Sequence, residues 1–568
     1  MRTIFGYVKP KAPMMALQLL IKFLGTVIEL FLPWMLSTII DVYVPRGDMR
    51  AICLLGGAMT LCAAAALAGN VIANRMATRI SKEITLRIRG DLFRRTTALS
   101  CAQTDRFTLP SLISRLTSDT YNVHQMIDRM QRLGVRAPIL LIGGICVTFS
   151  LEPVLTLVLV ATLPLLAGVV WAVTAKGVPM YTRTQQALDG MVRKVQENMA
   201  GVRVIKALSK TDTERQRFDE ANREVVNREQ RAGALMAVTN PIMNLLLNLG
   251  LTAVLIVGAY RVNAGDTLPG AIIAFMSYFT IILNALMMVT RLFVMYSKGA
   301  ASARRIEEVL LAPGELPVTP APAVREDAFV AFDHVRFSYN KKEANLEDVS
   351  FALKKGETLG VIGPTGSGKS TLVALLLRFY DADAGQIRID GRPIGSIPME
   401  ELRAYFGVAL QNDFLYADTL RENIDFGRGL TDAQLRAALE IAQADFAREK
   451  AGGLDAELHR RGSNLSGGQK QRALVARAVA ACPDILILDD ASSALDYRTD
   501  AALRKALHTR MAGATQVIVA QRVSSVMHAD HILVLEEGRV IGAGTHAELL
   551  RDCPSYREIY EIQMGEVA

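Results

Sequence analysis

The sequence lacks paired cysteines. Its six cysteines are scattered, and none forms a C-x-x-C pair or has the spacing of metal ligands. Small zinc-binding modules need such clusters, so we exclude them and expect the cysteines to pack as small apolar residues. A secretory cleavage site is also missing, because the basic start MRTIFGYVKPKAPMM leads into a long apolar run without a small-residue cleavage pattern. We therefore expect this run to stay in the chain as a transmembrane helix.

Apolar residues, by contrast, are abundant. They make up 51% of the chain, which carries a formal net charge of +8. Basic residues in excess are found in nucleic-acid-binding proteins, but they are also expected when the cytoplasmic loops of a membrane protein collect Lys and Arg. The hydrophobic content favours the membrane interpretation, and we predict no nucleic-acid partner.

Six apolar stretches are long enough to cross a hydrocarbon core of about 30 Å. They lie near residues 15–41, 51–74, 130–150, 154–175, 234–260 and 270–295. The long connections 75–130 and 176–233 favour helix and are rich in arginine, which places them and the N-terminus in the cytoplasm. We predict an all-α, multi-pass transmembrane domain over residues 1–310, with long intracellular helical extensions, in contact with the lipid of a bacterial cell membrane.

The pattern changes after residue 310. Four prolines and a glycine in LAPGELPVTPAPAVRED predict an extended linker over residues 311–327. From residue 328 to 568, short β-branched runs alternate with helical patterns, which is typical of an α/β domain around a largely parallel sheet. Because an even number of crossings precedes it, we expect this domain in the cytoplasm as well.

The α/β domain contains a phosphate-binding loop. GPTGSGKST follows the strand-like run ETLGVI and precedes an apolar helix, which is the context that a P-loop requires. Its glycines let backbone N–H groups approach phosphates, Lys369 neutralises the β and γ phosphates, and Ser370 ligates Mg²⁺. The predicted ATP-binding loop comprises Gly363, Pro364, Thr365, Gly366, Ser367, Gly368, Lys369, Ser370 and Thr371.

Two further motifs accompany the P-loop. The buried strand ILILDD ends in Asp489, where a second carboxylate that orients Mg²⁺ belongs in P-loop enzymes. NLSGGQ places Ser466, with its Gly-Gly turn, at the start of a helix, which is another set of donors suited to phosphate. A single site does not need two such helix starts.

This combination resembles the ATP-binding cassette (ABC) transporters, whose signature LSGGQ is present as Leu465–Gln469. The resemblance implies that two nucleotide-binding domains pair head to tail, so that the signature of one closes over the ATP held by the P-loop of the other. The signature residues expected to act on a partner's ATP are Ser466, Gly467, Gly468 and Gln469.

The resemblance also assigns residues outside these motifs. Tyr339 is expected to stack on adenine, although an isolated tyrosine at a strand end is more often a packing residue. Gln411 matches the glutamine loop that senses Mg²⁺ and the γ phosphate, and Asp496 matches the aspartate loop at the dimer interface. Mg²⁺ is expected at Ser370, Gln411 and Asp489, the last through water. ISRLTSD (113–119) and residues 196–222 resemble the two intracellular loops of the exporter branch, whose tips form coupling helices.

Two positions depart from the family pattern. Where the family has a glutamate that polarises the attacking water, this chain has Asp490, and where it has a γ-phosphate-contacting histidine, this chain has Gln521. Asp490 is a shortened general base, and Gln521 cannot carry charge. Because the ATP-holding residues and the signature are intact, we expect one subunit of a heterodimeric multidrug- or lipid-type exporter, with a weakened ATP site here and a working site in a non-identical partner.

Several questions stay open. A channel-like or regulatory family member, gated by ATP, and a homodimeric exporter with slow hydrolysis are alternatives. Soluble family members that act on ribosomes or DNA are excluded by the six apolar stretches. The cargo is an unknown small molecule, lipid or peptide. Lys22 and Glu29 share one helix face, as do Asn244 and Asn248, but each pair serves either substrate contact or helix packing.

Overall fold

The computed structural model describes residues 2–411, 413–449 and 451–565. They belong to two compact units: residues 1–97 with 109–312 form the membrane unit, and residues 98–108 with 313–568 form the nucleotide unit. Each unit is described by itself.

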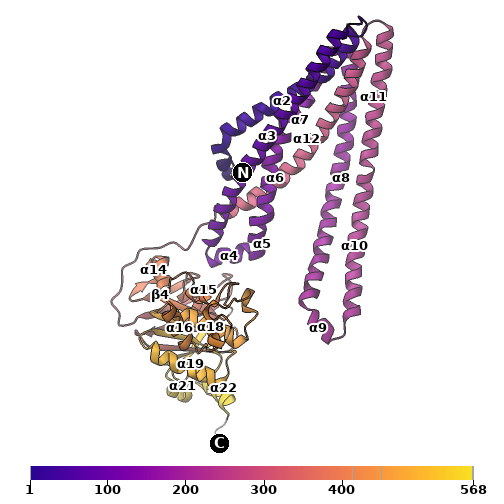
Figure 1. The fold of residues 1–568 in the computed structure, drawn as a ribbon. Coiled ribbons are helices and arrows are strands. Elements are labelled where there is room, and N and C mark those ends of the chain that lie inside the picture. The colour runs from indigo at the N-terminus through magenta and orange to yellow at the C-terminus, as the bar shows by residue number, and fades with distance from the viewer. Residues whose placement is uncertain (1, 412, 450, 566–568) are drawn as a thin grey trace. The chain divides into compact units, whose positions relative to one another are not determined.

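The membrane unit consists of long helices (Figure 1). Its helices are α1 (Arg2–Val8), α2 (Ala12–Thr38), α3 (Met49–Thr97), α5 (Leu109–Ser114), α6 (Thr120–Leu133), α7 (Arg136–Leu151), α8 (Pro153–Ala200), α9 (Val202–Ala207), α10 (Thr211–Ala237), α11 (Thr239–Asn263) and α12 (Pro269–Leu310). Single π-helical turns at Ile39–Tyr43 and Arg115–Asp119 extend α2 and join α5 to α6. Within the described residues, six helical spans are long and apolar enough to cross a membrane, so the predicted number is confirmed.

The helices of the membrane unit form two groups. The first group contains α2, α3, α6, α7 and α12, whereas α8 and α10 run side by side as a hairpin with α9 at its tip (Figure 1). The turn between α7 and α8 is a single extended residue, Glu152, and α8 begins at Pro153, where the missing N–H of proline costs no helical hydrogen bond. Many apolar side chains of this unit, such as Leu54, Leu61 and Trp171, are exposed, as expected for contact with lipid.

The nucleotide unit contains two sheets. The four-stranded antiparallel sheet has the order β2-β1-β4-β5, and the six-stranded sheet has the order β10-β9-β3-β8-β7-β6, parallel except for β10. The strands are β1 (Val330–Phe337), β2 (Leu346–Leu353), β3 (Thr358–Ile362), β4 (Ala384–Ile389), β5 (Arg392–Pro393), β6 (Phe406–Ala409), β7 (Ile485–Asp489), β8 (Thr515–Val519), β9 (His531–Glu536) and β10 (Arg539–Gly544). The expectation of an α/β domain around a largely parallel sheet is confirmed.

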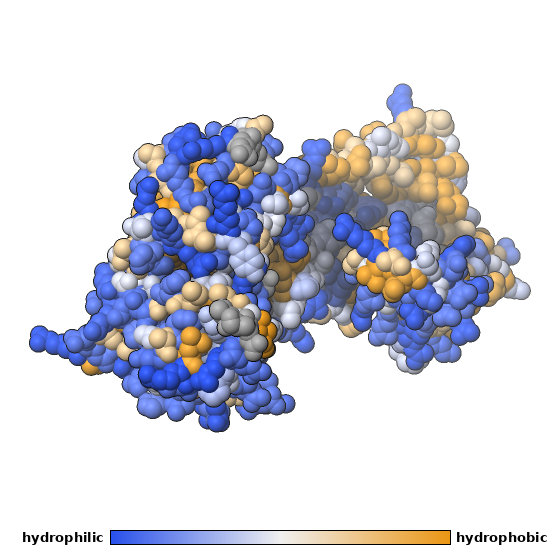
Figure 2. Space-filling model, turned by 90° about the horizontal axis from the view of Figure 1, so that it is seen from below, coloured by the Kyte–Doolittle hydropathy of each residue, from blue (hydrophilic) through white to orange (hydrophobic). Residues whose placement is uncertain are grey.

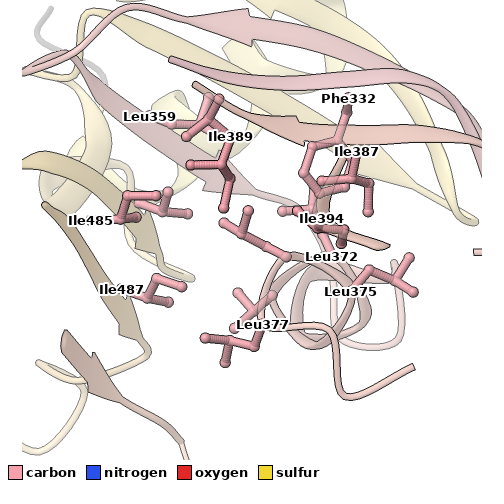
Figure 3. Packing of buried hydrophobic residues seen from close by; sticks show 14 of the residues in the cluster. Phe332, Leu359, Leu372, Leu375, Leu377, Ile387, Ile389, Ile394, Ile485 and Ile487 are labelled. Atoms are coloured by element: carbon pink, nitrogen blue, oxygen red, sulfur yellow. The ribbon is translucent and has the colours of Figure 1, made fainter. Parts of the chain in front are cut away.

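Helices surround these sheets. They are α4 (Cys101–Phe107), α13 (Lys369–Leu376), α14 (Met399–Ala404), α15 (Leu420–Asp425), α16 (Asp432–Ile441), α17 (Phe446–Glu449), α18 (Gly467–Ala480), α19 (Tyr497–Arg510), α20 (Val523–Val526), α21 (His546–Asp552) and α22 (Pro554–Met564). The main core lies between the two sheets, where Leu372 and Leu375 of α13 face Ile387 of β4 and Ile485 of β7 (Figure 3). This packing fixes the start of α13 at the carboxyl ends of β3 and β7.

The surfaces of the two units differ in polarity. In the view of Figure 2, the nucleotide unit is mostly hydrophilic with small apolar patches, whereas the membrane unit shows larger hydrophobic patches beside hydrophilic surface. This difference follows from the sequence, since the apolar runs are concentrated before residue 310.

Candidate nucleotide-binding site

The carboxyl ends of β3 and β7 border a cavity of about 260 Å³. Its lining residues are Asn345, Thr365, Gly366, Gly368, Lys369, Ser370, Thr371, Gln411, Asp489, Asp490, Val519, Ala520 and Gln521. Gly363 and Pro364 line a neighbouring cavity, and Ser367 is buried beneath the loop. The structure thus brings together most residues that the P-loop, the glutamine loop and the ILILDD strand predict.

The loop between β3 and α13 needs glycine at several positions. Gly366 and Gly368 have φ angles of +87° and +100°, which other residues rarely adopt. A Cβ atom at Gly363 would lie 2.1 Å from the carbonyl oxygen of Leu535, so only glycine fits there. The loop delivers the free N–H groups of the first turn of α13 to the cavity, which suits an anion.

Lys369 is held against its own loop. Its Nζ donates hydrogen bonds to the carbonyl oxygens of Gly363 and Pro364, both at 2.8 Å. Burial lowers the pKa of the ammonium, while the nearby carboxylates of Asp489 and Asp490 oppose this shift. The cation is therefore partly desolvated and can exchange its carbonyl partners for phosphate oxygens.

Asp489 ends β7 and is almost fully buried. Burial raises the pKa of its carboxyl group; a hydrogen bond with the Ser370 side chain opposes the shift, and Asp490 adds to it. A buried carboxylate beside a hydroxyl is a donor set that fits Mg²⁺, which prefers oxygen ligands and is usually completed by water and substrate phosphates. Gln411 adds an amide to the same cavity.

Asp490 lies at the rim of the cavity in an unusual backbone conformation. Its φ angle is +53°, and its N–H donates to the carbonyl of Val519 at 2.9 Å. Its Oδ2 accepts a long hydrogen bond of 3.4 Å from Nε2 of Gln411. The backbone carbonyl of Asp490 accepts from Gln471 Nε2 at 3.3 Å and from Ser493 Oγ at 3.0 Å. The shortened carboxylate therefore sits on a backbone that several hydrogen bonds hold in place.

Gln521 also lines the cavity, and its backbone is hydrogen-bonded to the helix α22. Nε2 of Gln563, on α22, donates to the carbonyl of Gln521 at 2.8 Å, and Oε1 of Gln563 accepts from the N–H of Val523 at 2.7 Å. Sequence reasoning missed Gln563 because no local pattern marks it. It also missed Gln471, which lies two residues after the signature and could have been found by that proximity.

Tyr339 follows β1 and is 49% exposed. Its ring makes edge-on contacts with Phe337 and Tyr380, with centroid distances of 4.8 and 5.0 Å. Its N–H donates to Oδ1 of Asn345 at 3.1 Å, and Asn345 lines the cavity. The backbone of Tyr339 is thus hydrogen-bonded to a residue that lines the P-loop cavity, but the half-exposed ring does not itself line that cavity.

The signature residues lie apart from this cavity. Ser466 caps α18: its Oγ accepts from the N–H of Gln469 at 3.2 Å, and Gln469 Oε1 accepts from the N–H of Ser466 at 3.0 Å. Gly467 is exposed and Gly468 is half-buried. Asp496 caps α19 through Thr499, whose N–H holds the pKa of the carboxyl below its usual range. Neither the signature nor Asp496 lines the P-loop cavity of its own chain.

The polar residues of the membrane helices bind one another. Lys22 is buried and donates to Oδ1 of Asn70 at 2.8 Å and of Asn74 at 3.1 Å. Glu29 accepts two hydrogen bonds from Arg136, at 2.8 and 3.0 Å. These partners favour helix packing over substrate contact for both residues. On α11, Asn248 donates to the backbone carbonyl of Asn244 at 2.8 Å.

Two family models match the chain. The model described as the ABC transporter transmembrane region matches residues 15–286, and the model described as ABC transporter matches residues 346–493. The uncharacterized ABC transporter ATP-binding protein YfiB of Bacillus subtilis is 34% identical over 570 residues, which cover 100% of this chain and 99% of the relative. The chain belongs to the ABC transporter family.

Other relatives of this ABC transporter agree. The fatty acid ABC transporter ATP-binding/permease protein of Mycobacterium bovis is 32% identical over 467 residues, covering 82% of this chain and 74% of that protein. The solved structure of a bacterial Atm1-family ABC exporter with ATP bound has a TM-score of 0.82 and 24% identity, covering 99% of each chain. The chain therefore has the fold of an ABC exporter half-transporter, with one transmembrane domain and one ATP-binding domain.

Proposed function

We propose that the chain is one subunit of a heterodimeric, ATP-driven exporter, and that its own P-loop site binds ATP well but cleaves it slowly. One observation carries this proposal. The cavity that holds Lys369, Ser370 and Asp489 also contains Asp490 and Gln521 at the positions where a hydrolytic family member has glutamate and histidine.

The retained residues are sufficient for binding. Lys369 and the N-terminus of α13 attract the phosphates, and Tyr339 offers a ring for adenine. Mg²⁺, when bound near Ser370, Gln411 and Asp489, would neutralise charge on the phosphate oxygens. These groups do not depend on the two altered positions.

The altered residues weaken cleavage. The side chain of Asp490 is one methylene shorter than glutamate, so its oxygens lie farther from an attacking water, and a misplacement of about 1 Å can cost about 10²-fold in rate. The backbone hydrogen bonds of Asp490 oppose a shift that would compensate. Gln521 can hydrogen-bond to phosphate but cannot become cationic.

The exposed signature supports a second chain. Because Ser466 and its glycines do not line the cavity of their own chain, they are free to close over ATP held by a partner. A partner with glutamate and histidine at the two altered positions would make one working site. A homodimer would contain two weakened sites, which is why we favour a non-identical partner. We place the N-terminus and the nucleotide unit on the cytoplasmic side of a bacterial cell membrane.

The cargo that we propose is amphipathic and lipid-like. A cavity of about 410 Å³ between α2 and α7 is almost entirely apolar and includes Phe23, Phe31 and Ile142. A curated relative is named a fatty acid transporter, which is consistent with such a cargo. Small hydrophobic molecules and peptides are the alternatives that a transport assay must compare.

The decisive experiment measures phosphate release by the purified chain, alone and with a candidate partner half-transporter. Alone, the chain should bind ATP but show little hydrolysis, and the partner should restore it. Ser466→Arg in this chain should abolish the activity of the pair, because it damages the working site, whereas Lys369→Ala should lower it less. Rapid hydrolysis by this chain alone contradicts the proposal. Ion flux in vesicles that is driven only by the ion's own gradient, without ATP-dependent uphill accumulation of cargo, would instead indicate a channel.

A further inference from the structure

The short helix α4 belongs to the nucleotide unit and is tied to it by one polar contact in particular. The hydroxyl of Tyr380 donates to Oδ2 of Asp105 at 2.6 Å, although the two residues are 275 positions apart. Burial and the Asp105 carboxylate raise the pKa of the Tyr380 hydroxyl above its ordinary value, so it stays protonated and remains a donor. A hydrogen bond to a carboxylate is among the stronger kinds in proteins.

The other side of the Tyr380 ring contacts the residue that we assign to adenine. The rings of Tyr380 and Tyr339 meet edge to face, with a centroid distance of 5.0 Å and an angle of 89° between their planes. Phe337 contacts both rings, at 4.8 Å from Tyr339 and 5.5 Å from Tyr380. Because edge-to-face geometry is specific, a rotation of the Tyr339 ring would disturb Tyr380.

Helix α4 is connected closely to two helices of the membrane unit. Residues 98–100 join it to α3, and Thr108 alone, with a φ angle of +62°, joins it to α5. Its start is fixed by a reciprocal capping box between Ser100 and Gln103. Such short connections leave little slack, so a displacement of α4 must be passed on to α3 and α5.

We infer that Tyr380 is a positioning residue that links adenine stacking on Tyr339 to the position of α4 through its hydrogen bond to Asp105. The inference rests on the role proposed above for Tyr339. It adds a contact near the proposed adenine position to the residues that are proposed to bind the phosphates. Bound nucleotide should therefore change the position of α4, which is connected directly to helices of the membrane unit.

The test uses the full-length chain in lipid nanodiscs. Hydrogen exchange of residues 98–108 is measured with and without Mg²⁺-ATP, and ATP affinity is measured in parallel with a fluorescent ATP analogue. In the wild type, ATP should slow exchange in this segment by about tenfold, as expected for strengthening one hydrogen bond to a carboxylate. Tyr380→Phe and Asp105→Ala should bind the analogue within about twofold of the wild type but lose this ATP-dependent difference.

The link from Tyr339 through Tyr380 and Asp105 to α4 is called the relay below. Matched variants separate this relay from simple loosening of α4. Asp105→Asn keeps an acceptor oxygen and should retain part of the ATP-dependent difference in hydrogen exchange. The double variant Tyr380→Phe with Asp105→Ala should lose no more of this difference than either single variant. Tyr405→Phe, whose ring packs on Phe329 elsewhere in the unit, should behave as the wild type.

Two results would overturn the inference. If Tyr380→Phe keeps the full ATP-dependent difference while Tyr339→Ala weakens ATP binding, the relay alone is wrong. If Tyr339→Ala binds ATP as tightly as the wild type, the adenine assignment fails and the relay fails with it.

Discussion

Gln563 donates a hydrogen bond from Nε2 to the backbone carbonyl of Gln521 at 2.8 Å, and it accepts one from the N–H of Val523 at 2.7 Å. The C-terminal helix α22 thereby holds both ends of a short loop on the wall of the nucleotide cavity. Gln521 stands where the family has its γ-phosphate-contacting histidine, so α22 determines where that side chain begins.

Replacing Gln563 should loosen this loop. Each neutral hydrogen bond contributes about 1 kcal/mol, so Gln563→Ala should raise the hydrogen-exchange rate of residues 520–526 by up to about 30-fold. Ile562→Ala is the matched control, because Ile562 is its neighbour on α22 and is 75% exposed. Equal exchange rates in the two variants would show that Gln563 does not hold the loop.

The attachment of α22 should depend on pH. Nδ1 of His546 lies 2.7 Å from the hydroxyl of the fully buried Tyr556. Burial lowers the pKa of His546, His528 adds to the shift, and the ring also contacts Tyr560. Since the unfolded imidazole titrates near 6.5, the stability that neutral His546 contributes is complete above pH 6.5 and is lost as the pH falls through its lower folded pKa.

Thermal unfolding of the full chain at pH 7.5 and 5.5 checks this expectation. His546→Gln should unfold at temperatures that differ less between the two pH values than those of the wild type. His508→Gln, at the exposed end of α19, serves as the control and should leave the wild-type difference intact. An unchanged pH dependence in His546→Gln would contradict the role assigned to this histidine.

Local patterns explain why much of the fold and site could be predicted. The six spans follow from length and apolarity alone, and the P-loop is recognisable because a strand, a glycine-rich turn and a helix follow one another without interruption. Asp489 could be placed because it ends a fully buried apolar strand, β7, which lies in the same parallel sheet as the P-loop strand β3, with β8 between them. For the spans and the P-loop, neighbours in the sequence are also neighbours in space, and for Asp489 the apolar run and its terminal carboxylate form one continuous pattern.

The rest depends on contacts between distant residues. Nothing near Asp105 indicates that it meets Tyr380, because the pairing exists only once α4 lies on the nucleotide unit. Gln563 is likewise 42 residues from Gln521. The positive φ angle of Asp490 could not be predicted either, because aspartate adopts such conformations more often than most residues but still at only a minority of its positions.

Restoring the two family residues should restore hydrolysis. The double variant Asp490→Glu with Gln521→His replaces the methylene and the imidazole that the site lacks, so phosphate release by the chain alone should rise by about 100-fold or more. Asp490→Glu alone should give part of this increase, and Asp490→Asn should give none. Adding Lys369→Ala to the double variant should abolish the gain. If the double variant hydrolyses ATP as slowly as the wild type, the weakness of the site has another cause.

The Asp489 carboxylate should lower the stability of the nucleotide-free protein but support the binding of Mg²⁺. Burial raises the pKa of its carboxyl above the ordinary 3.8, so the charged form costs stability at pH 7, and this cost disappears only as the pH falls through the raised pKa. Asp489→Asn removes the buried charge and should raise the nucleotide-free unfolding temperature by on the order of 2 °C. The same variant should lose the further stabilisation that Mg²⁺-ATP gives the wild type, because the carboxylate that orients the ion is gone.

Asp484→Asn, which breaks an exposed ion pair with Lys355, is the control. It should keep the stabilisation by Mg²⁺-ATP and show no rise in unfolding temperature without nucleotide. An Asp489→Asn protein that unfolds at a lower temperature, or that Mg²⁺-ATP still stabilises fully, would show that Asp489 supports the fold rather than the metal ion.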